Sequence, residues 1–311
     1  MGELRKDYVL DRWVIVDSNR ATRPHEFDKE HKAGHNGKCF FCPGNESSTP
    51  PEIGRIPKNG SWQIRWFENK FPATTTKARA FIDTHNRFYT FSQAYGHHEV
   101  IVETPRHDRQ LWDLSVDDIE KVLQVYARRI VALEKDSRIK YVCVFKNHGA
   151  QAGTSIVHSH SQLIALQMIP REIRDILQAM RRFVNCPYCS IVASESKSDR
   201  RCFENDKFSA FTPYASQFNY EVVIFPKSHV SRLEDVDLRS LSDILSLILR
   251  RVRAGGFDYN LIVNYGPQGS DFHFHIRVCP RIALWGGFEI GSGVVINTVA
   301  PEDAAAFYRG E

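Results

Sequence analysis

The sequence predicts an α+β protein in which one fold occurs twice in tandem. Each copy contains an antiparallel sheet with flanking helices. Two observations carry this prediction. Five short motifs recur in the same order in both parts of the chain, and each part combines β-branched strand patterns with a long amphipathic helix. The length of 311 residues suits two domains. We place them at residues 1–180 and 181–311.

Charge and hydropathy exclude several classes of protein. The 41 Lys and Arg nearly balance the 37 Asp and Glu, which argues against a nucleic-acid-binding surface. No apolar run approaches the roughly 20 residues of a membrane span, and the first residues lack the apolar core of a signal peptide. We therefore expect a cytoplasmic protein with no nucleic-acid or membrane partner.

The repeat is visible as two series of matching segments. Each series runs from a C-x-x-C pair through a strand with Glu eight residues before His to an H-x-H pair. The first series comprises residues 39–42, 66–73, 99–107, 141–149 and 158–160. The second comprises residues 186–189, 203–210, 221–229, 259–266 and 273–275. Any one match is weak, but five in the same order indicate duplication.

Local patterns predict the elements of each copy. Runs of β-branched residues predict strands at 99–102, 141–145, 221–225 and 260–263. Helical periodicity predicts helices at 115–135, where Ser115 is a cap signal, and at 238–253. An amphipathic segment at 171–183 leads to the domain boundary, near 178–184. The Pro- and Gly-containing stretches 49–60 and 264–269 predict surface loops.

The cysteines and histidines predict two metal sites. Structural zinc takes four Cys or His ligands, and a C-x-x-C pair supplies two of them from one turn. Each copy also offers a His after the Glu-to-His strand and another that opens the H-x-H pair. We assign Cys39, Cys42, His107 and His158 to one zinc site, and Cys186, Cys189, His229 and His273 to a second. Soft sulfur and nitrogen ligands also admit iron.

Some Cys and His residues have a different explanation. A redox C-x-x-C is the nearest alternative, but that motif normally opens a helix, and Cys42 is followed by a Pro-Gly-Asn turn. Three cysteines without a partner at ligand spacing are expected to be buried or inert thiols: Cys143, Cys202 and Cys279. We interpret His97 and His98 as loop histidines near the start of a strand.

The densest polar cluster follows Asn147. Alternate residues of a strand share one face, so His158, His160 and Gln162 are expected to project together. The Gly-rich loop before them, with Ser155, offers hydroxyl and N–H donors for a phosphate. An imidazole can attack phosphorus when its other nitrogen is held as a donor. Gln162 cannot titrate, and this favours transfer over hydrolysis.

These motifs resemble those of the galactose-1-phosphate uridylyltransferase family, in the histidine triad superfamily, and of its ADP-glucose phosphorylase-like members. The resemblance spans nearly the whole chain and rests on the C-F-x-C-x-G-N knuckle, the Phe67-Glu-Asn69 and Pro-x-His107 elements, the H-S-H-S-Q cluster, and His273-Phe-His275. It implies a duplicated histidine-triad (HIT-like) fold. It also implies a homodimer, and it matches Cys39, Cys42, His107 and His158 to the zinc ligands of the family.

The resemblance also implies roles for individual residues. His160 resembles the nucleophile that attacks the α-phosphorus of a nucleoside-diphosphate sugar such as UDP-glucose, releases sugar 1-phosphate and leaves a covalent nucleotidyl-histidine. Gln162 and Ser155 match residues at the phosphoryl oxygens. Four further positions match nucleotide-binding residues of the family: Arg20, Arg23, Asn69 and Asn147. A hexose 1-phosphate then accepts the nucleotide, in a ping-pong sequence.

The C-terminal region departs from the uridylyltransferase pattern. That family holds the hexose with a Glu and a Gln six residues later, whereas this chain has Glu289 followed by Val295. The complete second ligand set and the Gly-Phe-Glu-Ile-Gly-x-Gly ending resemble the ADP-glucose phosphorylases, in which inorganic phosphate is the acceptor. A zinc-stabilised nucleotide-binding protein without turnover is a third possibility.

The second copy is expected to lack an active centre, because Arg277 stands where the first copy has Gln162. We expect His275 to be a supporting or core residue. Lys227, Arg277 and Arg281 could contact substrate or belong to a solvated surface.

Overall fold

The computed structural model describes residues 2–22 and 38–311. Its helices are α1 (Val116–Leu133), α2 (Arg171–Met180), α3 (Pro187–Glu195), α4 (Leu238–Ala254), α5 (Gly287–Ser292) and α6 (Pro301–Arg309). Short 3-10 turns are η1 (Ser18–Thr22), η2 (Glu46–Ser48), η3 (Leu111–Asp113), η4 (Ala150–Ala152) and η5 (Leu233–Asp235).

The strands fall into three sheets. The ten-stranded sheet contains β3 (Glu52–Ile56), β4 (Ile64–Glu68), β7 (His98–Val102), β8 (Tyr141–His148), β9 (His160–Leu166), β10 (Arg201–Glu204), β11 (Phe208–Phe211), β12 (Val222–Pro226), β13 (Tyr259–Asn264) and β14 (His275–Pro280). A second sheet contains β1 (Glu3–Lys6), β2 (Trp13–Val16) and β15 (Val295–Asn297), and β5 (Asp83–Thr84) pairs with β6 (Thr90–Phe91).

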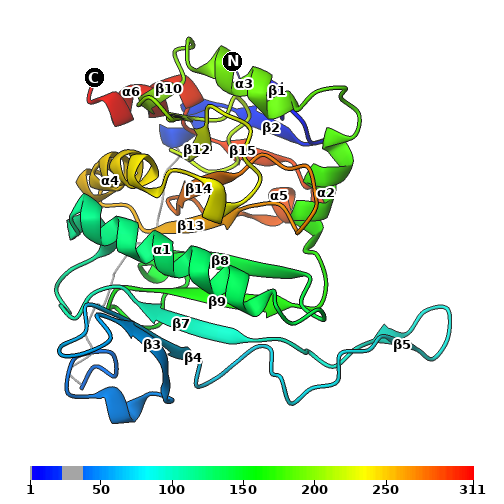
Figure 1. Cartoon of the computed structure of the whole chain (residues 1–311). Helices are drawn as coiled ribbons and strands as arrows, with labels where there is room; N and C mark the ends of the chain where they lie inside the picture. Colours follow the sequence, from blue (N-terminus) through cyan, green and yellow to red (C-terminus); the bar gives the residue numbers. More distant parts are fainter. Residues whose placement is uncertain (1, 23–37) are drawn as a thin grey trace.

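The large sheet contains the same arrangement twice. Its order is β10-β11-β12-β14-β13-β8-β9-β7-β4-β3, and every pairing is antiparallel. Read outward from the centre, β8-β9-β7-β4 repeats the order of β13-β14-β12-β11. The central pairing of β8 with β13 joins the two copies into one sheet (Figure 1). The duplicated α+β fold predicted from the motifs is confirmed, and the predicted strands correspond to β7, β8, β12 and β13.

Helices α1 and α4 cover one face of the large sheet, one from each copy (Figure 1). Ser115 accepts a hydrogen bond from the Asp118 amide at the start of α1, and Asp237 accepts one from the Ser240 amide at the start of α4. Both helices bury apolar residues at helical spacing, including Ile119 and Val122 in α1. The two predicted helices are therefore found within two residues of their expected bounds.

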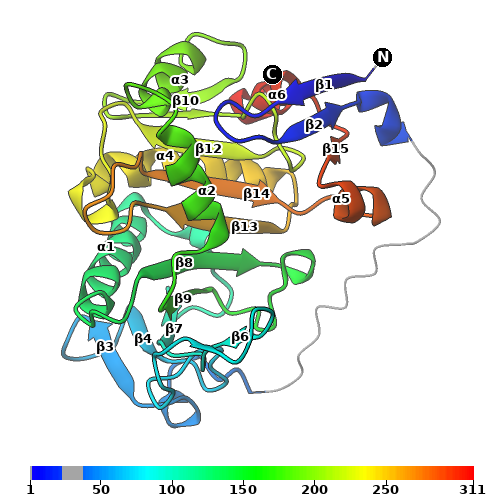
Figure 2. The same cartoon turned by 90° about the vertical axis from the view of Figure 1, so that its right-hand side faces the viewer.

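The opposite face of the second copy is covered by α2, α3 and the turn between β1 and β2 (Figure 2). Because β15 pairs in parallel with β2, the N-terminal residues lie beside the C-terminal region. Arg5 reinforces this contact through an ion pair with Glu302 at 3.0 Å. Sequence periodicity could not reveal this crossing of the chain, and the division at residues 180 and 181 stays a prediction.

Two expected surface loops are corrected. Residues 52–56 within the stretch 49–60 form edge strand β3, which pairs with β4 through a bulge near Gly54. The flanking Pro and Gly residues had obscured this short strand. Residues 264–267 are buried, because Tyr265 stacks on Tyr141 at 4.7 Å between ring centroids. In the part of the chain that the structure describes, no helix could cross a membrane.

Candidate active site and metal clusters

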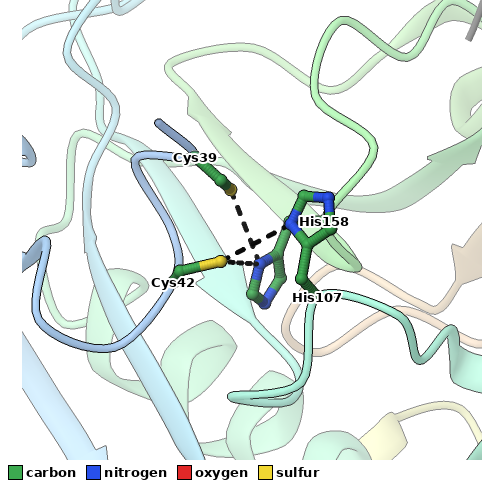
Figure 3. Close-up of side chains that lie close together, drawn as sticks. All are labelled: Cys39, Cys42, His107 and His158. Carbon is green, nitrogen blue, oxygen red and sulfur yellow. Dashed lines mark hydrogen bonds between the residues drawn. The ribbon is translucent and has the colours of Figure 1, made fainter. Parts of the chain in front are cut away.

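The first Cys and His cluster assembles from three distant segments (Figure 3). Cys39 and Cys42 lie in a turn before η2, His107 follows β7, and His158 lies two residues before the start of β9. Their ligand atoms all lie within 4.8 Å of one another. The Nδ1 atom of His158 lies 3.6 Å from each cysteine Sγ, and His107 Nδ1 lies 3.5 Å from Cys42 Sγ.

These distances suit a tetrahedral metal ion. Zinc bonds of about 2.3 Å to sulfur and 2.0–2.1 Å to nitrogen, at tetrahedral angles, place S and N about 3.6 Å apart. His158 is also held in the tautomer that a ligand needs, because its Nε2–H donates to the Thr104 carbonyl at 2.7 Å and leaves the Nδ1 lone pair free. The cluster is therefore able to hold a metal ion.

The second cluster repeats this geometry. His273 Nδ1 lies 3.5 Å from Cys186 Sγ and 3.6 Å from Cys189 Sγ, and His229 Nδ1 lies 3.6 Å from Cys189 Sγ. His273 Nε2 donates to the Pro226 carbonyl, as His158 donates to Thr104. Cys186 caps α3, so this pair does open a helix, as a redox motif would. Its convergence with two histidines nevertheless favours metal binding.

His160 is the first residue of β9 and is only 7% exposed. Its Nδ1–H donates to the His158 carbonyl at 2.8 Å, which leaves the Nε2 lone pair available. Burial and the nearby Lys146 lower the pKa of His160 to about 4. The imidazole is therefore neutral at pH 7, the form that can act as a nucleophile.

The Gln162 side chain is oriented by a histidine that sequence reasoning placed in a loop. His98 is the first residue of β7 and is buried, and its Nε2 lies 2.9 Å from Gln162 Oε1. Its Nδ1 accepts from the Ala73 amide at 3.1 Å, so Nε2 carries the proton and donates to Gln162. Asn69 donates to the same oxygen at 3.4 Å. With its oxygen occupied, Gln162 can present its amide N–H groups to a ligand.

Strand register could have identified His98. Val102 pairs with His160 and Val100 pairs with Gln162, so alternate residues of β7 share the face of the candidate site. Register also corrects the match between the two copies. In β12 and β14, Val223 pairs with Arg277, which makes Glu221 the counterpart of His98 rather than of Glu99.

In the second copy an ion pair replaces the His98 to Gln162 contact. Arg277 donates to Glu221 at 2.7 Å and also lies 3.5 Å from Glu172 of α2. His275 is 5% exposed and stacks on Phe225, with ring centroids 4.6 Å apart. Burial lowers the pKa of His275 to about 3. His275 is therefore a core residue, and Arg277 is not part of a solvated surface.

The loop between β8 and β9 is held by the second copy. Asn260 of β13 donates to Asn147 Oδ1 at 2.8 Å and to the Ala152 carbonyl at 3.0 Å. The Gln151 amide donates to the Asp258 carboxylate at 2.8 Å. Arg281 donates to Asn260 at 2.9 Å, so it too is tied to this loop. Because Asn147 Oδ1 is occupied, its amide N–H groups remain for a ligand.

The remaining predicted positions are more dispersed. Ser155 is exposed in the β8–β9 loop, and Arg20 is exposed in η1. Glu289 accepts from the Gly286 amide at 2.9 Å at the start of α5. Among the described residues, no hydrogen bond joins these three side chains to His160 or Gln162. Arg23 lies outside the described residues. Lys227 pairs with Glu204 at 3.0 Å.

Two of the three unassigned cysteines are buried, namely Cys202 and Cys279, while Cys143 is partly buried. Burial raises the pKa of the Cys143 thiol to about 11. At neutral pH such a thiol is a poor nucleophile, so these cysteines have no evident reactive role.

A sheet duplicated around a central strand pair, with an H-x-H-x-Q strand at a Cys and His cluster, defines a nucleotidyltransferase of the histidine triad class. The family model described as galactose-1-phosphate uridyl transferase, N-terminal domain, matches residues 2–170. The chain belongs to the galactose-1-phosphate uridyl transferase family and is an enzyme. A domain model of unknown function also matches residues 96–306.

Curated relatives match along nearly the whole chain. The ADP-glucose phosphorylase of Arabidopsis thaliana is 34% identical over 99% of this chain and 92% of its own length. The galactose-1-phosphate uridylyltransferase of Thermotoga maritima is 26% identical over 99% of this chain and 98% of its own length.

Solved structures share the fold over the same extent. An ADP-glucose phosphorylase from Arabidopsis thaliana with bound ADP-glucose superposes with a TM-score of 0.85 at 30% identity, covering 100% of this chain and 99% of that one. A uridylyltransferase structure superposes with a TM-score of 0.76 at 25% identity, covering 100% and 98%.

Proposed function

We propose that this enzyme moves a nucleoside monophosphate from a nucleoside-diphosphate sugar to a phosphate acceptor through a covalent nucleotidyl-His160. His160 Nε2 attacks the α-phosphorus, the bond to the bridging oxygen breaks, and sugar 1-phosphate departs. An acceptor phosphate oxygen then attacks the same phosphorus and breaks the P–N bond. The observation that carries this proposal is the buried, neutral His160, whose Nδ1–H is held by the His158 carbonyl.

Neighbouring residues take the binding roles in this proposal. Gln162, fixed by His98, and Asn147, fixed by Asn260, donate amide N–H groups to phosphoryl oxygens. The remaining proposed substrate contacts are Arg20, Arg23, Asn69, Ser155 and Glu289. By analogy with the uridylyltransferase relatives, the donor is UDP-glucose and the acceptor is a hexose 1-phosphate.

Phosphorolysis of an ADP-sugar by inorganic phosphate is a second candidate function. Two observations favour it. Val295 replaces the expected hexose-binding Gln, and its side chain is buried in β15, where it could not replace the polar contact. The relative that is 34% identical is an ADP-glucose phosphorylase.

We propose that both Cys and His clusters hold zinc. The S···N distances of 3.5–3.6 Å and the two buried histidine tautomers support this assignment. Zinc in the first cluster would fix His158, two residues before the nucleophile, in its tautomer and orientation. The zinc is assigned a structural role, and the reacting groups are protein side chains.

We also propose a homodimer. The β5–β6 hairpin projects from the body of the molecule (Figure 1), and it exposes several large apolar side chains, Ile82, Phe88 and Tyr89 among them. Light scattering on the purified full chain should give twice the monomer mass. A monomer mass at micromolar concentration would contradict this proposal.

Transfer of label tests the function and separates the candidates. UDP-glucose and ADP-glucose, each labelled at the α-phosphate, are incubated with the enzyme, and acid-labile label on the protein is counted. We expect label from one of them, and its release by either galactose 1-phosphate or inorganic phosphate identifies the acceptor. No label from either sugar nucleotide would contradict the covalent nucleotidyl-His160 mechanism.

A further inference from the structure

A closed ionic network lies beneath the candidate nucleophile, on the side of the sheet covered by α1. Its members are Glu103, Tyr126, Lys146, Ser159 and Ser161, and all five are buried. We propose that this network is a positioning device for His160, with Lys146 and Glu103 fixing the backbone of β9 so that the imidazole is held ready for attack. This inference rests on the proposed role of His160.

The network reaches His160 through its main chain. Lys146 Nζ donates to the His160 carbonyl at 3.1 Å, to Ser159 Oγ at 2.9 Å and to Glu103 Oε2 at 2.7 Å. The three donors of the ammonium group are thereby all used. Two of these acceptors belong to consecutive residues, Ser159 and the first residue of β9. One fixed charge therefore holds the start of the strand, where the candidate nucleophile projects from the other face.

Glu103 completes the clamp. Its Oε2 accepts from Ser159 Oγ at 2.5 Å, and its Oε1 accepts from Tyr126 at 3.1 Å and from Ser161. Burial alone would raise the pKa of Glu103, but Lys146 and the two serine hydroxyls outweigh burial and lower it. The Glu103 carboxylate therefore stays ionised, and its oxygens and the donors of Lys146 all have partners, which makes the network rigid.

The second copy shows that the fold does not need this network. Because Gln162 pairs with Phe145 and Arg277 pairs with Ile262, Lys146 corresponds to Val263. The serines correspond to Phe274 and Ile276 by their places beside the H-x-H histidines. Val263, Phe274 and Ile276 are at most 2% exposed. The same strand positions therefore fold with an ordinary apolar core.

Stability alone also gives little reason for a buried ion pair at these positions. The attraction within a buried ion pair must compensate for the desolvation of both charges. Replacing such a pair with well-packed apolar residues is therefore often neutral or stabilising. Among the residues that the structure describes, the ionic version occurs only beneath the copy with the H-x-H-x-Q strand. The ionic network therefore occurs in the copy that contains the candidate nucleophile, although the fold does not require it. This is expected of a positioning device.

The decisive variant removes both charges, as the second copy does. Glu103→Leu/Lys146→Met in the full chain should keep the wild-type metal content and a KM for the sugar nucleotide within about twofold. The single-turnover rate of protein labelling from α-phosphate-labelled ADP-glucose or UDP-glucose should fall about 30- to 100-fold, because a small displacement of a reacting group is costly. Labelling at the wild-type rate would overturn the proposal.

Two single variants test the proposal even if the double variant fails to fold. Ser159→Ala and Ser161→Ala each remove one hydroxyl and keep both charges, and each should slow labelling about three- to tenfold without changing KM. The matched control is Ser209→Ala, which removes a hydroxyl from a fully buried serine of β11 in the second copy. If the β9 variants label as fast as this control, the proposal is wrong.

Amide hydrogen exchange separates this proposal from the proposed function. The Ser159→Ala and Ser161→Ala variants should exchange faster than the wild type at β9, with β14 unchanged, and this readout needs no turnover. If the wild type takes no label but amide exchange in the serine variants is faster at β9 alone, the proposed function is wrong and the positioning role of the network is supported. If β9 exchange is unchanged, the clamp is refuted whatever the labelling result.

Discussion

At the scale of single residues, hydrogen bonds to fixed partners decide which atom of each side chain can act. His158 and His160 are two residues apart, yet His158 presents Nδ1 to the cysteine cluster and His160 keeps Nε2 free. The carbonyls of Thr104 and His158 make this difference. The His98 to Gln162 contact works in the same way, because it occupies the amide oxygen and leaves the donors.

Replacing His98 tests its role in orienting Gln162. His98→Ala should lower the rate of nucleotidylation about tenfold or more, because the Gln162 donors are no longer held toward the phosphoryl oxygens. Metal content should be unchanged. The matched control is His97→Ala, one residue earlier, which should label at close to the wild-type rate. Equal rates for both variants would show that Gln162 does not depend on His98.

A half-buried histidine away from the metal clusters, His148, predicts a pH dependence of stability. Burial and nearby Lys146 lower the pKa of His148 to about 4. Between pH 6.5 and pH 4 the unfolded chain binds a proton at this position that the folded chain refuses, so stability falls as pH falls through this window. His148→Phe should show a smaller loss of urea midpoint between pH 7 and pH 5. An identical loss in both proteins would contradict the assignment.

At the scale of elements, the second copy supports the site of the first. Strand β13 pairs with β8, and Asn260 of β13, with Asp258 just before the strand, holds the loop that follows β8. Gly149 allows this contact, because a Cβ there would lie 1.9 Å from Asp258 Oδ1, and its φ of +84° disfavours other residues. The second copy thus shapes the loop that we propose to bind phosphate in the first copy.

Substitution of Gly149 should disturb this loop. Gly149→Ala is expected to lower the free energy of unfolding by about 1–3 kcal/mol and to slow labelling, because both the backbone conformation and the Asp258 contact oppose a side chain. Gly153→Ala is the control, since it has a similar φ of +82° but open space around its Cβ. The Gly149 variant should therefore be the less stable of the two in urea unfolding.

The elements also show what the sequence could predict. Helix periodicity and caps predicted α1 and α4, and motif order predicted the duplication and the residues that form both metal clusters. Local patterns could not show that β15 pairs with β2, since this contact joins the two ends of the chain. They also matched Glu221 with Glu99, because a shift of one residue is visible only from strand register.

At the scale of the whole molecule, the two copies share an architecture and differ in chemistry. Both have a Cys and His cluster, but only the first places it beside a strand with His160 and Gln162. In the second copy, Arg277 and Glu221 fill the corresponding space with an ion pair at 2.7 Å. The two clusters should therefore affect activity differently.

Removing one cluster at a time tests this asymmetry. Cys42→Ala and Cys189→Ala should each lose metal and lower Tm, because structural metal ligation contributes directly to folding. Cys42→Ala should also abolish labelling, since it disturbs His158 and the start of β9. Cys189→Ala should keep a substantial part of the labelling rate. Metal content and label are measured on the same samples, and equal loss of labelling in both variants would contradict unequal roles.

The central claim is that His160 is the nucleophile and His158 a metal ligand. The most direct measurement is His160→Ala, assayed for metal content and for acid-labile label from α-phosphate-labelled ADP-glucose and UDP-glucose. We predict the wild-type metal content and no label on the variant, against clear labelling of the wild type. Labelling of His160→Ala at the wild-type level, or loss of its metal together with its label, would contradict the assignment.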